Sequence, residues 1–393
     1  MKIGLLTYHW VPNFGAQLQT LSTYNYLKRS GYSPIIINWV PKDTKAYYAG
    51  VMPEQRQKHA DFINRNCLLT EEFSEPNKVL SILNHNEITH VVIGSDSLFN
   101  IYKPFRSIRS FKMIYPSLDH QYPNPFWGVG YESIPHAALS VSSQNAKYTS
   151  FEKDRTKIGD ALQQFKTITV RDKWTQSLVS YFTNGNVVPD ITPDPVFAFN
   201  SNVPQKLTKQ EFCKNNNLPE KYILLSFSNG RMRAPKSWIE SIVRKFNKEG
   251  YECVELGKVG GQKLDLDCVY SLPIDPMDWY NVIRFSSAYI GVLMHPIVVC
   301  LHNSIPFFSI DHYGTGPLFM TKKTSSKIYD ILSKANLLDY HFLQRNHIAL
   351  PSSEKVFELV MDFPRDKCLR FSEMQQQRCL DNMNFVVSGL ING

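Results

Sequence analysis

Several signatures of common protein classes are missing from this 393-residue chain. No stretch reaches the roughly 18 consecutive apolar residues that a membrane span requires. No CxxC pair or HExxH segment offers a metal-ligand spacing, and a GxGxxG fingerprint, a P-loop and a GxSxG elbow are also absent. We therefore predict no metal site from these motifs.

Charge is not concentrated in any tract. The 43 Lys and Arg residues exceed the 35 Asp and Glu residues, which gives a formal net charge of +8. Such an excess favours anionic ligands in general. Since no dense basic tract and no RNA- or DNA-binding signature accompanies it, we predict no nucleic-acid partner.

Cysteine is scarce and scattered, and its odd number indicates reduced structural thiols. The seven positions are Cys67, Cys213, Cys253, Cys268, Cys300, Cys368 and Cys379. The N-terminus, MKIGLLTYHW, predicts a first β-strand rather than a signal peptide. We expect a cytoplasmic protein, with peripheral contact to the inner membrane as an option.

The chain does have a regular alternation of β-branched runs and helical patterns, with 43% hydrophobic and 13% aromatic residues to fill its cores. Strands are predicted at 2–8, 34–38, 90–94, 137–142, 167–171, 222–227, 251–256, 268–273, 288–293 and 306–310. Helices are predicted at 16–30, 152–165, 173–183, 235–249, 276–287 and from 296, and the last sixty residues look helical. This alternation is typical of parallel sheets with crossover helices.

Residues 192–221 are rich in Pro, Asn and Lys and separate two strand–helix series. We predict an N-terminal Rossmann-like domain at 1–195, a second at 196–350 and a helical segment at 351–393. The expected fold is α/β and GT-B-like, with two domains facing a cleft and C-terminal helices packing back on the first domain. Ligands are expected beyond the carboxyl ends of the strands.

Two loops of the first domain offer polar groups at strand ends. Asn13 and Gly15 lie where the first strand gives way to a helix, so backbone N–H groups there could face an anionic donor. Ser95 and Asp96 follow the strand HVVIG and could orient or deprotonate an acceptor hydroxyl. Both loops have a structural alternative, since any α/β protein needs such turns and Ser and Asp commonly cap helices.

Arginines follow two other strands. Arg171 ends TITVR and suits bidentate capture of a phosphate or carboxylate, with an ion pair to Asp172 or across domains as the alternative. Ser228 and Arg231 lie in the loop SNGRMR, a second candidate anion site in which the arginines could instead be only solvated.

His295 stands at the junction of the buried strand AYIGVL and the next helix. An imidazole at that place could act as a general acid or base near neutral pH. The alternative is a buried structural histidine.

Six segments, in order, resemble the polysaccharide pyruvyltransferase family. They are IGLLTYHWVPNFGAQLQTLSTYNYLKRSGY with Gln17 and Gln19, VVIGSDSLFN, LSVSS centred on Ser142, TITVRDKWTQSLV, PDITPDPVFAF and IRFSSAYIGVLMHPIVVCLHNSIPFFSID. The resemblance covers about residues 2–312. Ser97, Phe99, Leu293 and Pro296 depart from the family pattern.

The resemblance implies transfer of a pyruvyl group from phosphoenolpyruvate, as co-substrate, to hydroxyls of a saccharide or lipid-linked oligosaccharide in cell-surface polysaccharide biosynthesis, forming a pyruvate ketal. It implies donor binding by Arg171 and acid or base catalysis by His295. Asp96 is the candidate base for the acceptor, and Ser95 and Ser142 are expected to bind it. No metal or cofactor is expected.

Two other functions are weighed beside this one. A GT-B glycosyltransferase would need a nucleotide-sugar site, for which Asp275, Asp278 and Trp279 are the candidates. A non-catalytic family member that binds a glycan is favoured by the departures at Leu293 and Pro296. Because a fold hosts many functions, the reaction is less certain to be inherited than the fold.

Overall fold

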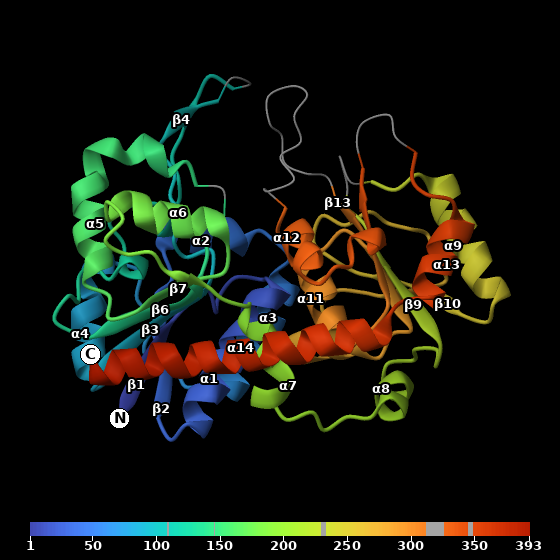
Figure 1. The fold of residues 1–393 in the computed structure, drawn as a ribbon, viewed down its shortest axis with the longest axis horizontal. Helices are drawn as coiled ribbons and strands as arrows, with labels where there is room; N and C mark the ends of the chain where they lie inside the picture. Colours follow the sequence, from blue (N-terminus) through green and yellow to red (C-terminus); the bar gives the residue numbers. More distant parts are fainter. Residues whose placement is uncertain (108–109, 145, 229–232, 312–325, 345–348) are drawn as a thin grey trace. The chain divides into compact units, whose positions relative to one another are not determined.

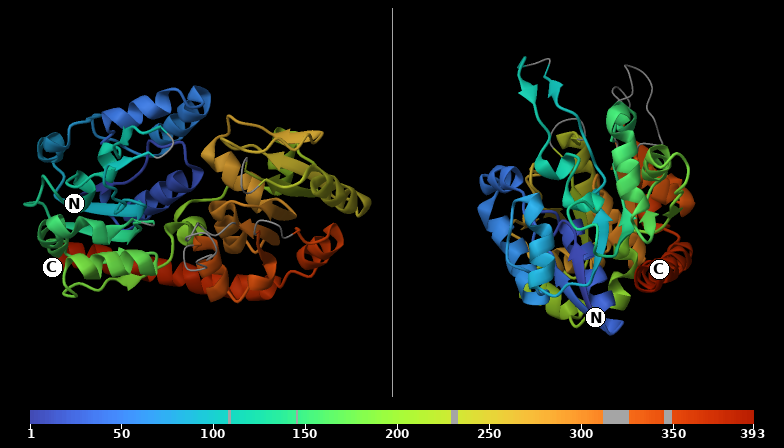
Figure 2. Two further views of the ribbon diagram at one scale, coloured as in Figure 1. Left: turned by 90° about the horizontal axis from the view of Figure 1, so that it is seen from above. Right: turned by 90° about the vertical axis from the view of Figure 1, so that its left-hand side faces the viewer.

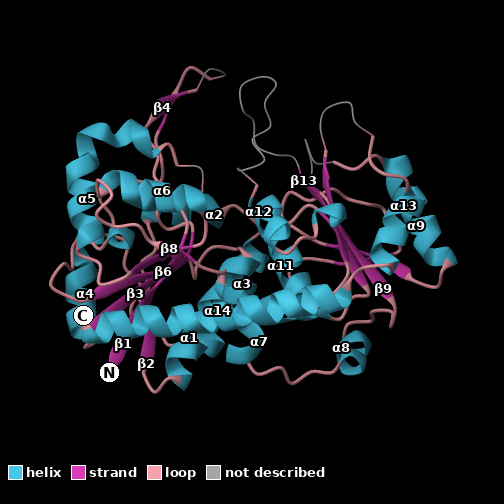
Figure 3. Ribbon diagram, viewed as in Figure 1, coloured by secondary structure: helices cyan, strands magenta, loops and turns pink. Residues whose placement is uncertain are grey.

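The computed structural model describes residues 1–107, 110–144, 146–228, 233–311, 326–344 and 349–393 and divides into two compact units (Figure 1). Unit 1 comprises Met1–Pro204 and Gln375–Gly393, and unit 2 comprises Gln205–Met374. Each unit contains one parallel sheet with helices around it, as the colouring by secondary structure makes clear (Figure 3). The predicted α/β alternation is therefore confirmed.

The sheet of unit 1 has six parallel strands in the order β2-β1-β3-β6-β7-β8. Their bounds are β1 (Lys2–Leu6), β2 (Ser33–Ile36), β3 (His90–Asp96), β6 (His136–Val141), β7 (Ile168–Val170) and β8 (Asp190–Ile191). A separate antiparallel pair joins β4 (Phe105–Arg106) to β5 (Met113–Ile114). The central strands β3 and β6 are buried on both faces, as apolar runs in parallel sheets require.

Helices lie on both sides of the unit 1 sheet (Figure 2, left). They are α1 (Phe14–Arg29), α2 (Lys42–Ala49), α3 (Pro53–Asn66), α4 (Val79–His85), α5 (Arg155–Gln163), α6 (Lys173–Phe182) and α7 (Phe199–Asn202), with short 3-10 turns η1 (Pro76–Lys78), η2 (Leu118–His120), η3 (Pro125–Trp127), η4 (Tyr148–Asp154) and η5 (Pro195–Ala198). The helix predicted at 16–30 corresponds to α1, which ends at Arg29 with Ser30 as its C-cap. Gly31 has φ +86°, and its N–H and that of Tyr32 donate to the carbonyls of Lys28 and Leu27, a Schellman cap.

The sheet of unit 2 has the order β11-β10-β9-β12-β13-β14, again all parallel. Its strands are β9 (Tyr222–Ser226), β10 (Glu252–Leu256), β11 (Cys268–Tyr270), β12 (Ala288–Gly291), β13 (Phe307–Asp311) and β14 (His341–Leu343). Its helical elements are α8 (Lys209–Asn215), α9 (Lys236–Lys248), α10 (Pro276–Arg284), α11 (Met294–His302), α12 (Lys327–Lys334), η7 (Leu338–Tyr340) and α13 (Ser353–Met361).

The last sixty residues are not wholly helical, because β14 extends the unit 2 sheet. Only three residues form this strand, HFL, and all three are partly exposed. A run that short carries no period-2 pattern, so no signal in the sequence separates it from the helical material around it.

The division between the units differs from the boundaries expected from the sequence. It falls between Pro204 and Gln205 rather than after residue 195, because η5 and α7 pack on α1. Ser22 of α1 donates to the carbonyl of Pro195 (2.9 Å) and accepts from the side chain of Asn202 (3.1 Å). The Pro-, Asn- and Lys-rich segment at residues 192–221 therefore begins within unit 1.

The C-terminal helix α14 (Arg365–Asn392) belongs to both units. In unit 2, Cys368 and Ser372 contact the carbonyls of Leu301 and His302, whereas in unit 1 Asn382 donates to Ser140 Oγ at 3.0 Å. The prediction that the C-terminal helices pack back on the first domain is therefore confirmed for the C-terminal part of α14. By contrast, α13 packs on α9 within unit 2.

All seven cysteines are free thiols, and only Cys268 is not buried. Burial raises the pKa of Cys67, Cys253 and Cys368 to about 12. Such thiols are inert packing residues in the folded state. Within the described ranges, no helix combines the length and the hydropathy needed to cross a bilayer.

Gly159 in α5 provides a test of the unit 1 packing. A Cβ there would lie 2.2 Å from the carbonyl oxygen of Phe182 in α6. We expect Gly159→Ala to destabilise the protein by about 1–3 kcal/mol although alanine is the better helix former. Gly50→Ala is the control, since a Cβ at that position would have nothing within 4 Å. Equal unfolding midpoints for the two variants in urea would contradict this packing.

Candidate functional site

Each sheet has one point at which the strand order reverses, and several of the predicted residues lie at these points. In unit 1 the reversal lies between β1 and β3, and Asn13, Ser95 and Asp96 lie at or just beyond the ends of these strands. In unit 2 it lies between β9 and β12, which are followed by Ser228 and His295. Ligands of open α/β sheets bind outside the carboxyl ends of strands at such points.

The segment Gly94-Ser95-Asp96 ends β3 with positive φ angles at Gly94 and Asp96. Gly94 has φ +145°, and a Cβ there would lie 2.1 Å from the carbonyl oxygen of Leu139. Asp96 has φ +101°, an unfavourable value for a residue with a side chain. Strain of this kind concentrates at functional sites, where surrounding contacts hold it.

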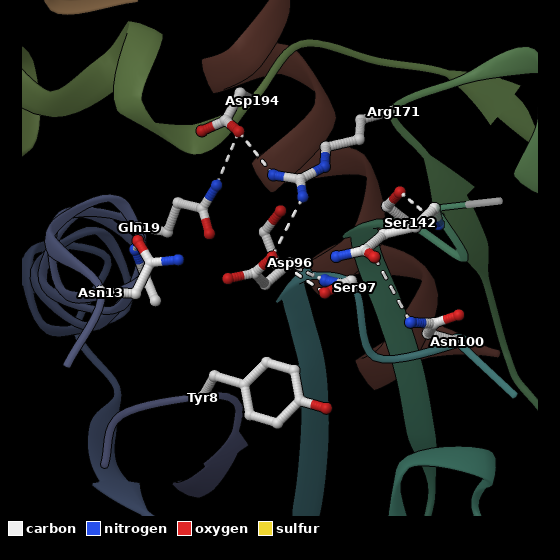
Figure 4. A network of polar contacts seen from close by, with 12 residues as sticks. Tyr8, Asn13, Gln19, Asp96, Ser97, Asn100, Ser142, Arg171 and Asp194 are labelled. Carbon is white, nitrogen blue, oxygen red and sulfur yellow. Dashed lines mark hydrogen bonds and ion pairs between the residues drawn. The ribbon is translucent and has the colours of Figure 1, made fainter. Parts of the chain in front are cut away.

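Those contacts centre on Arg171, which follows β7 and is almost fully buried (Figure 4). Its Nη2 donates to Asp96 Oδ1 at 3.1 Å and its Nη1 to Asp194 Oδ2 at 2.7 Å. Burial lowers the pKa of Arg171, but the carboxylates of Asp194 and then Asp96 outweigh it, and the pKa is raised overall. Arg171 is therefore a cation paired with two carboxylates.

The ion-pair partner of Arg171 is not the neighbouring Asp172, which the sequence offers as the local alternative. Asp172 caps α6, accepting from the N–H of Thr175 at 2.7 Å, and it also accepts from Ser142 Oγ at 2.6 Å. Asp194, which stands in the sequence only as part of an Asp-Pro segment, is the stronger partner. Donor binding by Arg171 stays a prediction.

Two glutamines of α1 extend this network. Gln19, fully buried, donates to Asp194 Oδ2 at 2.6 Å. Gln17 donates to the carbonyls of His9 (2.7 Å) and Val11 (3.1 Å) and so fixes the turn after β1. Figure 4 shows Gln19 and Asn13 of the same region. The paired glutamines of the sequence pattern thus hold the turn and the ion-pair network in place.

The remaining predicted residues of unit 1 have structural contacts. Asn13 is the N-cap of α1, accepting from the N–H of Ala16 at 3.3 Å, and Gly15 lies buried in the first turn of α1. Ser95 and Ser142 are fully buried, and Ser95 Oγ donates to the carbonyl of Ser140 at 2.7 Å. Acceptor binding by the two serines stays a prediction.

A cluster of aromatic and acidic side chains beside Asp96 was not expected from the sequence. Tyr8 donates to Asp119 Oδ2 at 2.7 Å, and the ring of Trp10 meets the ring of Tyr8 at 5.7 Å and that of Tyr48 at 6.1 Å. Burial, and next the Asp119 carboxylate, raise the pKa of Tyr8 well above its ordinary value, and the charge of Asp96 adds to the effect. We call Tyr8, Trp10, Tyr48 and Asp119 the aromatic–acid cluster.

Asp119 Oδ1 is buried and has no hydrogen-bond partner within the described parts of the chain. A buried carboxylate oxygen without a donor is costly unless a ligand or water supplies one. No sequence motif marks this group, because Asp119 lies more than a hundred residues from Tyr8 and in a short 3-10 turn.

In unit 2, Lys258 follows β10 and donates from Nζ to Ser228 Oγ at 2.6 Å. Burial lowers the pKa of Lys258. The strands β10, β9 and β12 are neighbours, so Lys258, Ser228 and His295 follow three adjacent strands. In the sequence, residues 257–261 form only a weak glycine-rich turn. The predicted donor residue Arg231 lies outside the described residues.

His295 is the second residue of α11, whose first turn has neither an acidic residue nor a side-chain cap. The N–H groups of such a turn and the helix dipole favour an anion. The hydroxyl of Tyr289 accepts from the N–H of Leu293, just before this turn, at 3.3 Å. Gly291 leaves room for that hydroxyl, because a Cβ at residue 291 would lie 2.3 Å from it. Of the two departures, Leu293 is the N-cap residue of α11, whereas Pro296 lies in the first turn and has no N–H to contribute.

Two of the three candidates for a nucleotide-sugar site, Asp275 and Trp279, have structural roles. Asp275 caps α10, accepting from the N–H of Met277 at 2.9 Å, and Trp279 is 3% exposed. A base cannot stack on a ring that is buried in the core. As for metals, no cluster of three or more His, Cys, Asp or Glu suited to a metal ion occurs among the residues described.

The whole chain is similar in fold to solved structures of epimerases and glycosyltransferases. UDP-GlcNAc 2-epimerase from Neisseria meningitidis, bound to UDP-GlcNAc, matches with a TM-score of 0.57 at 8% identity over 100% of both chains. A putative UDP-N-acetylglucosamine 2-epimerase from Listeria monocytogenes gives 0.55 at 8% identity, covering 100% of this chain and 97% of the other. A glycosyltransferase from Rickettsia africae gives 0.51 at 13%, covering 100% and 99%. The protein is thus an α/β protein of the GT-B class with two Rossmann-like domains.

The sequence profile of the polysaccharide pyruvyl transferase family matches residues 13–313. The chain belongs to this family, as the resemblance implied. No curated protein sequence matches it.

The buried pairing of Arg171 can be tested by unfolding. Arg171→Met leaves Asp96 and Asp194 buried without their cation, so we expect a loss of about 3–5 kcal/mol in the free energy of unfolding, measured in urea. Replacing both aspartates by asparagine in the same variant is expected to restore part of it. Lys42→Met, which breaks the exposed pair with Glu75, is the control and is expected to change little. An equally small loss for Arg171→Met would show that the pair does not stabilise the fold.

Proposed function

We propose that this protein transfers a pyruvyl group from phosphoenolpyruvate to hydroxyls of a saccharide, forming a pyruvate ketal and releasing inorganic phosphate. The observation that carries the proposal is membership of the polysaccharide pyruvyl transferase family over residues 13–313. The residues at the two topological switch points support it, because they supply the groups that the reaction needs.

The donor is an anion with a phosphate and a carboxylate, which suits the switch point of unit 2. Lys258 supplies a cation there, Ser228 a hydroxyl, and the uncapped start of α11 a set of N–H donors. Lys258 takes the place of the predicted Arg231 in this proposal. Phosphoenolpyruvate is an activated donor, so the transfer needs no cofactor.

His295 is proposed as the general acid. Protonation of the donor methylene carbon makes the adjacent carbon electrophilic, and the first acceptor hydroxyl then bonds to it. The second hydroxyl forms the other C–O bond as the C–O bond to phosphate breaks. One of the two hydroxyl protons replaces the proton given to the methylene carbon, and the other leaves with a base or the phosphate. A helix start stabilises the departing anion.

Asp96 is proposed as the base that accepts a hydroxyl proton. Its Oδ1 is held by Arg171 Nη2 and by the N–H of Ser97 at 2.7 Å, so the carboxylate is fixed in orientation. In this proposal Arg171 is therefore a positioning residue, in place of the donor-binding role that the family resemblance implied. The neighbouring aromatic–acid cluster suits a saccharide acceptor, because aromatic rings contact the apolar faces of sugars while Asp119 accepts from a hydroxyl.

Thermal melting with ligands tests the proposal. Phosphoenolpyruvate is expected to raise the melting temperature, by mass action, and UDP- and GDP-sugars are not. Lys258→Met is expected to lose this shift. His295→Asn is expected to keep the shift but to lose the release of inorganic phosphate when an acceptor saccharide is added, since binding and proton donation are separate roles.

Lys248→Met, at an exposed lysine near the end of α9, is the control for Lys258→Met and is expected to keep the shift. Stabilisation by a nucleotide sugar, or by none of the three ligands, would overturn the proposal. An unchanged shift in Lys258→Met would move the donor site away from β10.

A further inference from the structure

An arm projects from unit 1 between β3 and β6 and takes no part in the sheet. It contains the antiparallel pair β4 and β5, and we define it by its described residues 102–107 and 110–115. It extends away from the rest of unit 1 in two views (Figure 1; Figure 2, right). A two-stranded hairpin on its own is only marginally stable, so an arm of this kind is expected to have a partner.

The arm exposes large apolar side chains that a water-facing hairpin would not keep. They are Tyr102 (38% exposed), Phe105 (57%), Phe111 (71%), Met113 (49%), Ile114 (42%) and Tyr115 (71%). Single exposed apolar residues are ordinary, but a contiguous group marks an interaction surface.

Phe111 is the most informative of these residues. Its backbone has φ +53°, a conformation that favours glycine and is a genuine outlier for a bulky side chain. The N–H of Phe111 donates to the carbonyl of Ser107 (2.8 Å), and the N–H of Ser107 donates to the carbonyl of Lys112 (2.9 Å). Phe111 thus has a strained backbone conformation at a position where glycine would have no steric strain. Strain of this kind indicates a functional role for the aromatic side chain rather than a role in folding.

The charge of the arm has one sign. Residues 97–118 contain no Asp or Glu, while Lys103, Arg106 and Lys112 are all exposed. Arg106 lies over the ring of Phe111 at 5.9 Å and donates from Nε to the carbonyl of Phe111 at 3.0 Å. Cations interleaved with exposed aromatic and aliphatic side chains are the composition that binds an anionic membrane surface.

We propose that the β4–β5 arm docks this protein on an anionic lipid bilayer, with Phe105, Phe111 and Ile114 entering the headgroup region and the cations facing lipid phosphates. A protein partner would be expected to provide acidic side chains for the same cations, whereas a bilayer supplies both an apolar layer and a dense anionic layer. The proposal is independent of the reaction proposed above, and its test uses no substrate.

The test is co-sedimentation of the full chain with vesicles of phosphatidylcholine alone and of phosphatidylcholine with one third phosphatidylglycerol. We expect binding to the second vesicles only, weakened at high salt because charges near a surface are screened. Lys103→Glu/Lys112→Glu is expected to weaken binding by at least about 25-fold, since each cation lost near an anionic surface costs about fivefold. Phe111→Ser is expected to weaken it at least about tenfold.

Each control variant makes the same kind of substitution as an arm variant, but at a position outside the arm. Lys28→Glu/Arg29→Glu makes the same change in net charge at the end of α1. That end precedes the start of β2, on the side of the sheet where β1 and β2 begin, whereas the arm follows the carboxyl end of β3. Phe385→Ser removes a ring that is 56% exposed on α14. Both are expected to bind vesicles as the parent does, and all variants are to melt at the parent temperature.

Absence of binding to the anionic vesicles would overturn the proposal, as would equal losses in arm variants and controls. A change in self-association of the arm variants, measured by light scattering with vesicle binding unchanged, would assign the arm to contact between copies of the chain instead.

Discussion

The structure of unit 1 depends on one buried cation held between two carboxylates. Arg171 joins the end of β7 to Asp96 at the end of β3 and to Asp194 before η5, and Gln19 brings α1 to the same point. A buried ion pair of this kind is not a large net source of stability, because desolvation offsets most of the attraction. Its role is to specify geometry: without Arg171 both Asp96 and Asp194 would be buried charges with no paired cation, so the turn at Asp96 is held in one conformation.

The two units have the same arrangement of strands around the point where the strand order reverses, but they carry different side chains there. Both sheets reverse their strand order beside the first strand of the unit, and both present loops and helix starts at that point. In unit 1 the loops carry carboxylates and aromatic rings, whereas in unit 2 they carry Lys258, Ser228 and an uncapped helix. An acidic, aromatic edge suits a neutral polyhydroxylated ligand, and a cationic edge with N–H groups at a helix start suits a phosphate.

The sequence predicted the alternation of strands and helices, the fold class and the family, because buried parallel strands are apolar on both faces and the motifs keep their order. It also indicated Arg171 and Asp96, but not that they are paired with each other. Asp194 and Asp119 reach the site only through long-range packing, and Lys258 is marked only by a weak glycine-rich turn. The sequence could not show that Ser95 donates to the Ser140 carbonyl and Ser142 to Asp172, because these contacts depend on how β3, β6 and β7 pair.

The thiols described above make the chain its own reporter of local opening. Cys67 and Cys379 lie in unit 1, and Cys213, Cys253, Cys268, Cys300 and Cys368 lie in unit 2. A buried thiol with a raised pKa reacts with an alkylating reagent only when its surroundings open and it can form a thiolate. The order in which the seven thiols are alkylated under native conditions therefore records which unit opens first, residue by residue, without an added probe.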